Sequence, residues 1–281
     1  MAESLAAWLA LREPADAAAR SAVVTQAVVE ALPDDRPLRL LDLATGTGSN
    51  VRFLAARLPG SSIFPGSPST PPGASPGPPI GQDWVAVDRD PVLLAQVPPY
   101  ATTRCLELGS LDDPGLFSGR HLVTASALLD LVSASWMVAL VEHCRAAGAA
   151  GLFALNYDGR SRCWPREPED DVVLDLFNRH QRASDKGFGV AAGPAAADCV
   201  SRCFAAAGYS VRRKRSDWEL APAFGDLQRV LIAGWGQAAA EIAPDQADLI
   251  GSWTARRLEH VDHGRSRIHV GHQDVAVWLP K

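Results

Sequence analysis

Apolar positions along the chain fall into two patterns, short continuous runs and longer stretches with helical spacing. The run from Leu38 to Ala44 is almost wholly apolar, which is typical of a strand buried on both faces of a parallel sheet. Before it, residues 13–32 carry apolar side chains at helical spacing and predict a helix with Pro14 in its first turn. After it, residues 49–58 predict another helix. The segment therefore reads as helix, strand, turn and helix.

The alternation continues to the end of the chain. Further strands are predicted at 84–88, 103–108, 121–126, 151–157, 209–220 and 267–279, and further helices at 136–147, 170–183, 195–207, 224–240 and 244–260. The apolar phase of the last strand changes near Gly271, which predicts a bulge or a hairpin tip there. Strands that alternate with helices predict a doubly wound α/β fold.

One segment breaks the pattern. Residues 59–81 are dominated by Pro, Gly and Ser, so they are predicted to form a disordered surface insertion. Without this segment, the preceding helix and the strand at 84–88 lie within a normal loop length. We therefore expect a single domain over residues 1–281, with an N-terminal helical region at 1–36 and helical insertions at 158–194 and 222–264.

Composition and charge narrow the class of protein. The 281 residues are 47% hydrophobic and carry a net charge of -5, which favours a globular protein over one that binds nucleic acid or an acidic membrane. The basic cluster Arg212 to Arg215 is followed by acidic residues and contains no aromatic residue, so a solvated strand end is expected. The N-terminus lacks the positive region of a signal peptide, and no apolar run is long enough for a membrane span. A cytoplasmic protein without nucleic-acid or membrane partners is expected.

Cysteine and histidine give no sign of a metal centre. The five cysteines contain no CxxC pair, and Cys199 and Cys203 are expected to be small core residues on a helix. His260 and His263 could offer two nitrogens, but no third ligand is identifiable. No bound metal is predicted.

The turn after the first strand carries the strongest chemical signal. The sequence Asp42-Leu43-Ala44-Thr45-Gly46-Thr47-Gly48 lies at the carboxyl end of a strand and at the start of a helix, where open α/β sheets bind ligands. Its glycines let the backbone approach a ligand closely, and free amides at the helix start can donate hydrogen bonds. Asp88 ends the second strand, where a carboxylate can accept both hydroxyls of a ribose. Two separate elements thus point to a nucleoside.

This combination resembles the class I S-adenosylmethionine-dependent methyltransferases. Asp42, Gly46 and Gly48 match the acidic residue and two glycines of that family's motif, and Ala44 stands in place of the first glycine. The resemblance implies a Rossmann-like, mostly parallel sheet of seven strands with an antiparallel last strand, and S-adenosylmethionine as the cofactor. The cofactor-binding residues that we expect on these grounds are Asp42, Ala44, Thr45, Gly46, Gly48, Asn50, Asp88, Arg89, Ser110, Leu111 and Ser126.

Three other interpretations stay open. A nicotinamide-dependent oxidoreductase also has a glycine turn and an acidic residue after its second strand, but Val51 stands where its third glycine belongs and Asp42 would have no role. A catalytically silent, regulatory protein could keep the cofactor turn without a usable acceptor pocket. A turn of this sequence could also serve the fold without any ligand.

The resemblance implies methyl transfer to oxygen or nitrogen of a small molecule. Residues after the predicted fourth and fifth strands are the candidates for contact with the acceptor, with His180 as a candidate general base. A solvated helix end is the alternative, since basic residues near a helix C-terminus are common. The substrate-binding candidates are Asn156, Tyr157, Asn178 and Arg182.

Two further features have both a structural and a functional interpretation. Arg12, Asp16 and Arg20 recur every four residues, which favours ion pairs along a helix, while in the functional alternative Arg20 contacts the methionine carboxylate of the cofactor. The helical stretch at 222–264 contains Trp235 and Trp253 and could form a lid or a homodimer face.

Overall fold

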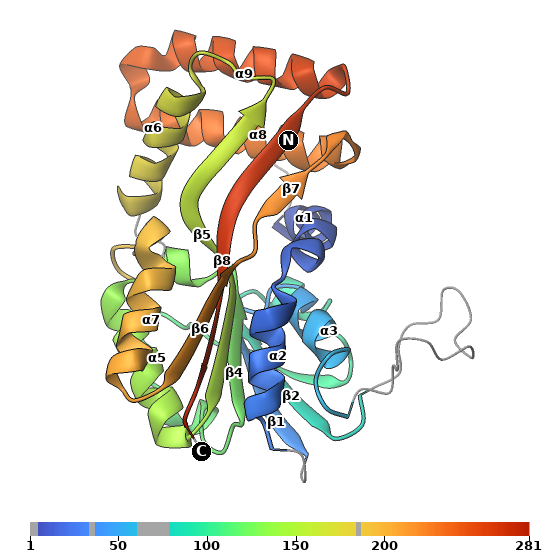
Figure 1. Cartoon of the computed structure of the whole chain (residues 1–281), viewed down its shortest axis with the longest axis vertical. Coiled ribbons are helices and arrows are strands. Elements are labelled where there is room, and N and C mark those ends of the chain that lie inside the picture. Colours follow the sequence, from blue (N-terminus) through green and yellow to red (C-terminus); the bar gives the residue numbers. More distant parts are fainter. Residues whose placement is uncertain (1–4, 34–36, 61–78, 184–186, 281) are drawn as a thin grey trace, which may run out of the picture.

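The computed structural model describes residues 5–33, 37–60, 79–183 and 187–280, and within them one sheet of eight strands. Its strand order is β3-β2-β1-β4-β5-β8-β6, with β7 paired to β8 beside β6 (Figure 1). The first five strands are parallel, and β8 runs antiparallel to β5, β6 and β7. The strands are β1 (Leu38–Leu43), β2 (Gln82–Asp88), β3 (Ala101–Cys105), β4 (Leu122–Ser126), β5 (Ala150–Trp164), β6 (Ser210–Arg215), β7 (Trp218–Leu220) and β8 (Arg267–Trp278).

Helices cover both faces of this sheet, with α2 and α3 on one side and α5 and α7 on the other (Figure 1). Short 3-10 turns (η1 to η5) lie at 114–116, 129–131, 193–195, 222–224 and 244–246. The helices are α1 (Leu5–Ala19), α2 (Ala22–Ala31), α3 (Ser49–Ala55), α4 (Pro91–Leu94), α5 (Ala134–Ala147), α6 (Asp170–Ala183), α7 (Ala196–Ala206), α8 (Gly225–Ile242) and α9 (Ala247–Asp262).

Strand β1 shows how the sequence produces these two layers. Successive side chains of a strand point to opposite faces. Leu41 and Leu43 pack in the core under α5 and α7, whereas Leu38 and Leu40 pack in the core under α2 and α3. Asp42 has the phase of Leu40, so its carboxylate faces α3. The hydrophobic run therefore buries both faces and leaves one charged group at the start of the following helix.

The far ends of β5 and β8 leave the main sheet and form a second core. We call this part the cap: β5 beyond Tyr157, β8 before His272, and β7, α6, α8 and α9 (Figure 1). Its interior contains Trp218, Trp235 and Trp253, which are all buried. The two predicted helical insertions therefore pack together, beside a strand β5 that extends seven residues beyond its predicted end at 157.

Several predicted elements need correction. The predicted helix at 13–32 is two helices, because Ser21 caps α2 through its hydroxyl, which accepts the amide of Val24. The first of them, α1, begins at Leu5, so Pro14 lies inside it and not in the first turn. The predicted strand at 209–220 is divided into β6 and β7, which adds an eighth strand to the seven expected. The predicted α/β class and the antiparallel strand β8 are confirmed. The pairing is irregular opposite Gly271, but the extra residues belong to β5 and β8 is continuous, so the bulge or hairpin tip predicted in the last strand is corrected.

The structure also places the basic cluster at 212–215 and the two tryptophans of the stretch 222–264. Arg212 to Arg215 lie on β6, a strand at the edge of the sheet, and are exposed as predicted. Trp235 and Trp253 are interior residues of the cap, so a lid or homodimer face formed by residues 222–264, which stays a prediction, would be built from other side chains. Most of the predicted insertion at 59–81 lies outside the described residues.

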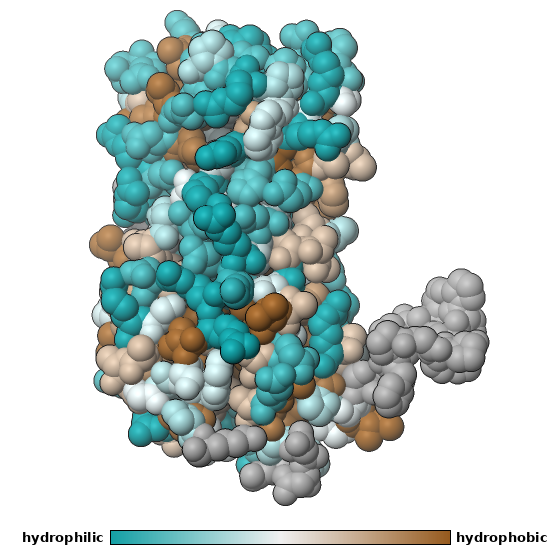
Figure 2. Space-filling view, viewed as in Figure 1, coloured by the Kyte–Doolittle hydropathy of each residue, from teal (hydrophilic) through white to brown (hydrophobic). Residues whose placement is uncertain are grey.

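The exposed surface is mainly polar. On the face seen in Figure 2, hydrophobic side chains are scattered in small groups among hydrophilic ones. Among the helices that the structure describes, none has the length and apolar content to cross a membrane.

Candidate functional site

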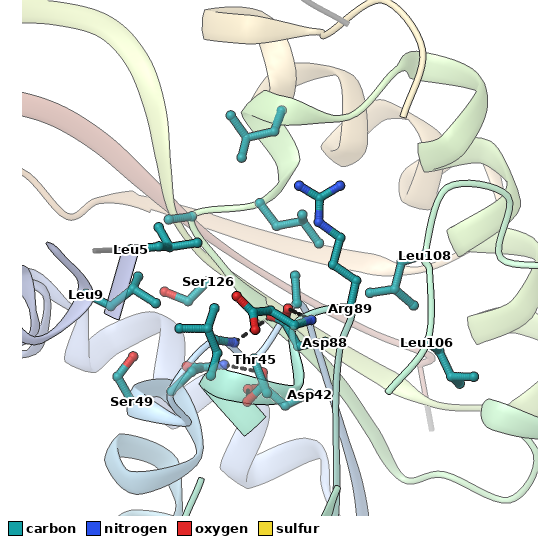
Figure 3. A pocket seen from close by; sticks show the side chains of 18 of the residues that line it. Leu5, Leu9, Asp42, Thr45, Ser49, Asp88, Arg89, Leu106, Leu108 and Ser126 are labelled. Atoms are coloured by element: carbon teal, nitrogen blue, oxygen red, sulfur yellow. Dashed lines mark hydrogen bonds between the residues drawn. The ribbon is translucent and has the colours of Figure 1, made fainter. Parts of the chain in front are cut away.

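A cavity of about 350 Å³ lies at the carboxyl ends of β1, β2 and β4, between α1 and the loop after β3 (Figure 3). This edge of an open α/β sheet is where ligands bind in doubly wound folds. The cavity is lined by Leu5, Leu9, Arg12, Asp16, Asp42, Ala44, Thr45, Gly46, Ser49, Asn50, Asp88, Arg89, Asp90, Leu93, Leu106, Glu107, Leu108, Ser126, Ala127, Leu128, Leu131 and Phe188. Of the expected cofactor residues, all except Gly48, Ser110, Leu111 and Arg20 line it.

Asp42 is fully buried and organises the turn. One carboxylate oxygen accepts the Thr45 hydroxyl at 2.6 Å, and the other accepts the Asn50 amide at 2.7 Å. Burial raises the pKa of Asp42 to about 6, although these two hydrogen bonds act in the opposite direction. The carboxylate therefore links the end of β1 to the start of α3, close to the cavity.

The backbone of the turn explains why glycine is favoured there. Ala44 has a φ of +50°, in the left-handed region that non-glycine residues seldom adopt. Gly46 and Gly48 also have positive φ values. A Cβ on Gly46 would lie 2.9 Å from Leu9 of α1, and one on Gly48 would lie 2.7 Å from Pro98. The two glycines thus meet conformational and packing demands together, and Ala44 carries the strain that the motif's first glycine would avoid.

Asp88, at the end of β2, forms a hydrogen bond with the turn that follows β1. Its Oδ2 atom accepts the Gly46 amide at 2.8 Å, and its Oδ1 atom accepts the Asp90 amide at 3.0 Å. Each carboxylate oxygen can accept more than one hydrogen bond, so both keep acceptor capacity towards the cavity. The two elements that the sequence singled out are therefore in direct contact.

The loop after β3 forms the opposite wall. Leu106, Glu107 and Leu108 line the cavity, and the indole of Trp136 donates a 2.6 Å hydrogen bond to the Leu108 carbonyl. Strand β3 ends at Cys105, three residues before the predicted end. The loop residues that line the cavity are therefore 106–108 and not the predicted Ser110 and Leu111. Ser110, which donates a hydrogen bond to Asp112, and Leu111 lie outside the lining.

Helix α1 supplies another wall of the cavity, with two lining residues that were not among the predicted ones. Leu5 and Leu9 project into the cavity beside Ser126, as Figure 3 shows. Arg12 pairs with Asp16 at 2.8 Å, as the spacing predicts, and Asp16 also accepts the indole of Trp218 at 3.0 Å. The four-residue spacing of Leu5 and Leu9 was the available signal, but the helix was expected to begin after them.

The predicted acceptor residues have other partners. Asn156 donates to the carbonyls of Phe153 and Gln273 inside the sheet. The Tyr157 hydroxyl donates to Asn178 at 2.9 Å, and burial raises the pKa of Tyr157. His180 pairs with Glu241 at 3.0 Å, and Arg182 is exposed.

None of these five side chains lines the main cavity. The physical reason is that β5 continues to Trp164. Residues 156 and 157 therefore lie within a strand and not at its carboxyl end, and the hydrogen bond from Tyr157 to Asn178 joins that strand to α6.

A second cavity, of about 220 Å³, adjoins the first. The two share Asp16, Ser49, Asn50 and Ser126. Arg20 lines this second cavity and donates a 2.7 Å hydrogen bond to Asn50. The Arg20 prediction therefore concerns a side chain next to the main cavity and not inside it.

No metal centre was found: the residues that the structure describes contain no group of three or more His, Cys, Asp or Glu side chains suited to a metal ion.

Comparisons with known proteins bear on the fold. No protein-family model and no curated protein sequence matches the chain. A cyclopropane-fatty-acyl-phospholipid synthase-like protein from Lactobacillus casei superposes with a TM-score of 0.54 at 13% identity, over 98% of this chain and 94% of that protein. An S-adenosylmethionine-dependent methyltransferase from Geobacter sulfurreducens, in complex with S-adenosylhomocysteine, gives 0.45 at 11% identity over 98% of both chains. A cyclopropane synthase from Mycobacterium tuberculosis gives 0.45 at 11% identity, over 90% and 82%. The first likeness, with the strand order and the antiparallel β8, shows that this chain has the Rossmann-like methyltransferase fold.

Proposed function

We propose that this protein binds S-adenosylmethionine in the main cavity and transfers its methyl group to oxygen or nitrogen of a small molecule. The observation that carries the proposal is the contact between the Asp42 turn and Asp88, which brings two nucleoside-binding elements to one cavity of about 350 Å³. Solved structures of the same fold, such as the Geobacter sulfurreducens protein with S-adenosylhomocysteine, are in keeping with it.

The residues present fit an adenosyl ligand. Asp88 has acceptor capacity for ribose hydroxyls, and Leu93, Leu106 and Leu108 offer an apolar wall for a base. Asp42 lies beside the cavity as a carboxylate that can balance a positive charge. When bound, the cofactor supplies an electrophilic methyl group on a sulfonium. The chain itself aligns the reactants, holds Asn50 through Asp42, and covers the cavity with α1.

The acceptor side of the cavity is largely apolar. Leu5 and Leu9 from α1 line it together with Leu128, Leu131 and Phe188. Carboxylates are the only groups in the described lining that could act as a general base near neutral pH, because no histidine, lysine, tyrosine or cysteine is present there. We therefore propose catalysis by alignment, and His180, which pairs with Glu241 outside the cavity, is not part of it.

The test is calorimetric titration of the purified chain with S-adenosylmethionine and S-adenosylhomocysteine. We expect binding that weakens by about ten- to a hundredfold in Asp88→Ala, because ribose hydroxyls lose a charged acceptor. Asp83→Ala is the matched control, since Asp83 lies on the same strand, is exposed, and is absent from the cavity lining. Equal affinity in both variants would refute the role of Asp88.

Two alternatives give different results. An oxidoreductase would bind a nicotinamide cofactor in preference, although Val51 is buried in the core under α3, in the place where the dinucleotide motif has its third glycine. A silent regulatory protein would bind S-adenosylmethionine without forming S-adenosylhomocysteine when a cell extract supplies acceptors. Turnover with such an extract supports the proposed enzyme.

A further inference from the structure

The second cavity contains a buried cation whose hydrogen bonds are incomplete. Arg20 is 9% exposed, and its Nε and one terminal nitrogen have no hydrogen-bond partner. Its nearest carboxylate, Asp274, lies 3.7 Å from Nε and already accepts the amides of Ser21 and Leu155 at 2.8 Å. A guanidinium keeps its charge under these conditions, and unpaired buried donors are costly. The arrangement is suited to an anion.

The other charges around this cavity leave a positive surplus. The carboxylate of Glu13 is engaged by Arg52 at 2.6 Å, and that of Asp16 by Arg12 at 2.8 Å. Arg20 and Arg57 both lie over the Phe53 ring, at 4.4 Å and 3.7 Å from its centroid. Arg57 donates to the Phe53 carbonyl and has no carboxylate partner in the structure as described. Arg20 and Arg57 thus both line this cavity, Arg57 without a carboxylate partner in the described structure and Arg20 with Asp274 only at 3.7 Å.

We propose that the second cavity binds a carboxylate or phosphate group of the methyl acceptor, so that this protein methylates an acidic small molecule. The inference rests on the proposed function. The main cavity alone is large enough for the cofactor, and the second joins it at Ser126, at the end of β4. An acid anchored on Arg20 would extend past Ser126 towards the main cavity. Planar guanidinium groups match both carboxylate and phosphate geometry.

The first experiment titrates inorganic phosphate and acetate into the full chain without cofactor, by calorimetry or NMR. We expect weak binding that falls by about tenfold or more in Arg20→Gln, since charged hydrogen bonds are lost, and by a smaller factor in Arg57→Gln. Arg57 is exposed, so that variant keeps the test valid if Arg20→Gln does not fold. Arg215→Gln is the control, because Arg215 is exposed on β6 outside the cavity. Absence of binding, or unchanged affinity in both cavity variants, would overturn the site.

The second experiment identifies the source of the anion. S-adenosylhomocysteine carries a carboxylate, whereas 5′-methylthioadenosine has the same nucleoside without the amino-acid end. We expect Arg20→Gln to bind both as the wild type does, which leaves the acceptor as the source. Loss of S-adenosylhomocysteine affinity alone would assign Arg20 to the cofactor and overturn the acceptor assignment. If the wild type binds phosphate but neither nucleoside, the proposed function fails while the anion site stands.

Discussion

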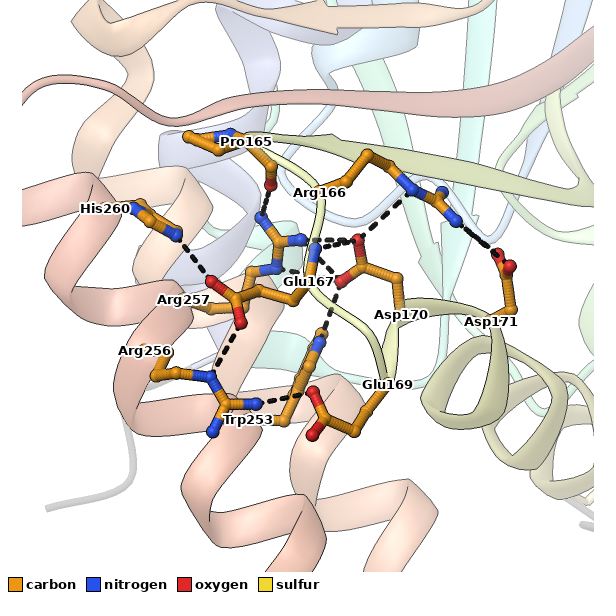
Figure 4. A network of polar contacts seen from close by, with 10 residues as sticks. All are labelled: Pro165, Arg166, Glu167, Glu169, Asp170, Asp171, Trp253, Arg256, Arg257 and His260. Carbon is orange, nitrogen blue, oxygen red and sulfur yellow. Dashed lines mark hydrogen bonds and ion pairs between the residues drawn. The ribbon is translucent and has the colours of Figure 1, made fainter.

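The cap and the main cavity use buried charge in opposite ways. In the cap, Arg257 is fully buried and its guanidinium donates to Asp170 and to the carbonyl of Pro165, while the indole of Trp253 donates to Asp170 at 2.8 Å (Figure 4). Around it, Arg256 joins Glu167 and Glu169, and Glu167 also contacts His260. Asp170 and Glu167 each accept from two side chains, so the network joins the start of α6 to α9.

At the cavities the pairing is incomplete. The Nε and one terminal nitrogen of Arg20 have no hydrogen-bond partner. Asp42 accepts two hydrogen bonds, and its burial raises its pKa to about 6. A buried charged group with unsatisfied donors lowers the stability of a folded chain unless a ligand satisfies them. The two regions thus differ in a buried guanidinium: the three nitrogens of Arg257 in the cap all donate hydrogen bonds, whereas the hydrogen bonds of Arg20 at the cavities are incomplete.

The largest expected effect comes from breaking the paired network. Arg257→Leu leaves Asp170 buried without its cation and should lower the free energy of unfolding by about 3–5 kcal/mol. The double variant Arg257→Leu with Asp170→Leu should recover most of this loss, because no lone charge remains. Urea denaturation measures both. Equal stability of the wild type and Arg257→Leu would show that the network does not support the cap.

His272 gives a pH test between the two regions. It lies 5.0 Å from the Trp218 ring and 6.2 Å from the Tyr157 ring, between centroids. Burial first, and then the positive charge of Arg12, lower the pKa of His272 to about 3, against the effect of Asp217.

A lowered pKa means that the folded chain holds the neutral ring. Its stabilising contribution is therefore complete above about pH 6.5 and is lost as the pH falls towards 3. We expect urea unfolding to show a loss approaching 1.4 kcal/mol for each pH unit below 6.5, and a flatter dependence in His272→Phe. His263→Gln, on an exposed position, should keep the wild-type slope. If the free energy of unfolding changes with pH by the same slope in all three proteins, His272 does not cause the pH dependence.

Asp42 makes the complementary prediction for binding. Its raised pKa of about 6 means that the carboxylate is mostly charged at pH 7.5 and mostly protonated at pH 5. A sulfonium ligand favours the charged form, so affinity for S-adenosylmethionine should fall by about tenfold between these pH values. In Asp42→Asn the affinity should be lower and should not change with pH between 7.5 and 5. If the wild type binds S-adenosylmethionine equally well at both pH values, the charge of Asp42 does not contribute to binding the sulfonium.

The sequence predicted the cofactor side of the molecule better than the rest for a physical reason. The turn, Gly46, Gly48 and Asp88 are each read from a strand and its adjoining residues, and their contact follows from parallel pairing of β1 with β2. The acceptor side depends on contacts between distant segments. Strand β5 continues past polar residues such as Asp158 and Arg160 because it pairs with β8 again from Ser161 onwards, and local alternation contains no sign of that partner.

The dependence on contacts between distant segments also explains why Leu5 and Leu9 were not predicted as lining residues of the main cavity. Leu5 and Leu9 are ordinary apolar positions of a helix, and only the docking of α1 over Gly46 makes them part of a cavity. The paired charges of the cap were equally hidden, because Asp170 and Arg257 are separated by most of the insertions.

The smallest predicted effect concerns strain in the turn. Ala44 at φ +50° costs about 1–2 kcal/mol relative to an ordinary conformation. Glycine avoids this cost, but it also raises the conformational entropy of the unfolded chain, which offsets part of the increase in the free energy of unfolding. Ala44→Gly should therefore stabilise the protein by up to about 1 kcal/mol. Ala55→Gly, in the last turn of α3, should do the opposite by a similar amount. Thermal unfolding measures both. If Ala44→Gly leaves the affinity for S-adenosylhomocysteine unchanged, the strain at Ala44 is a tolerated departure from glycine. If the affinity falls, the rigid alanine preorganises the turn for binding. The main cavity would then resemble the cap, because both would depend on a fixed arrangement of residues.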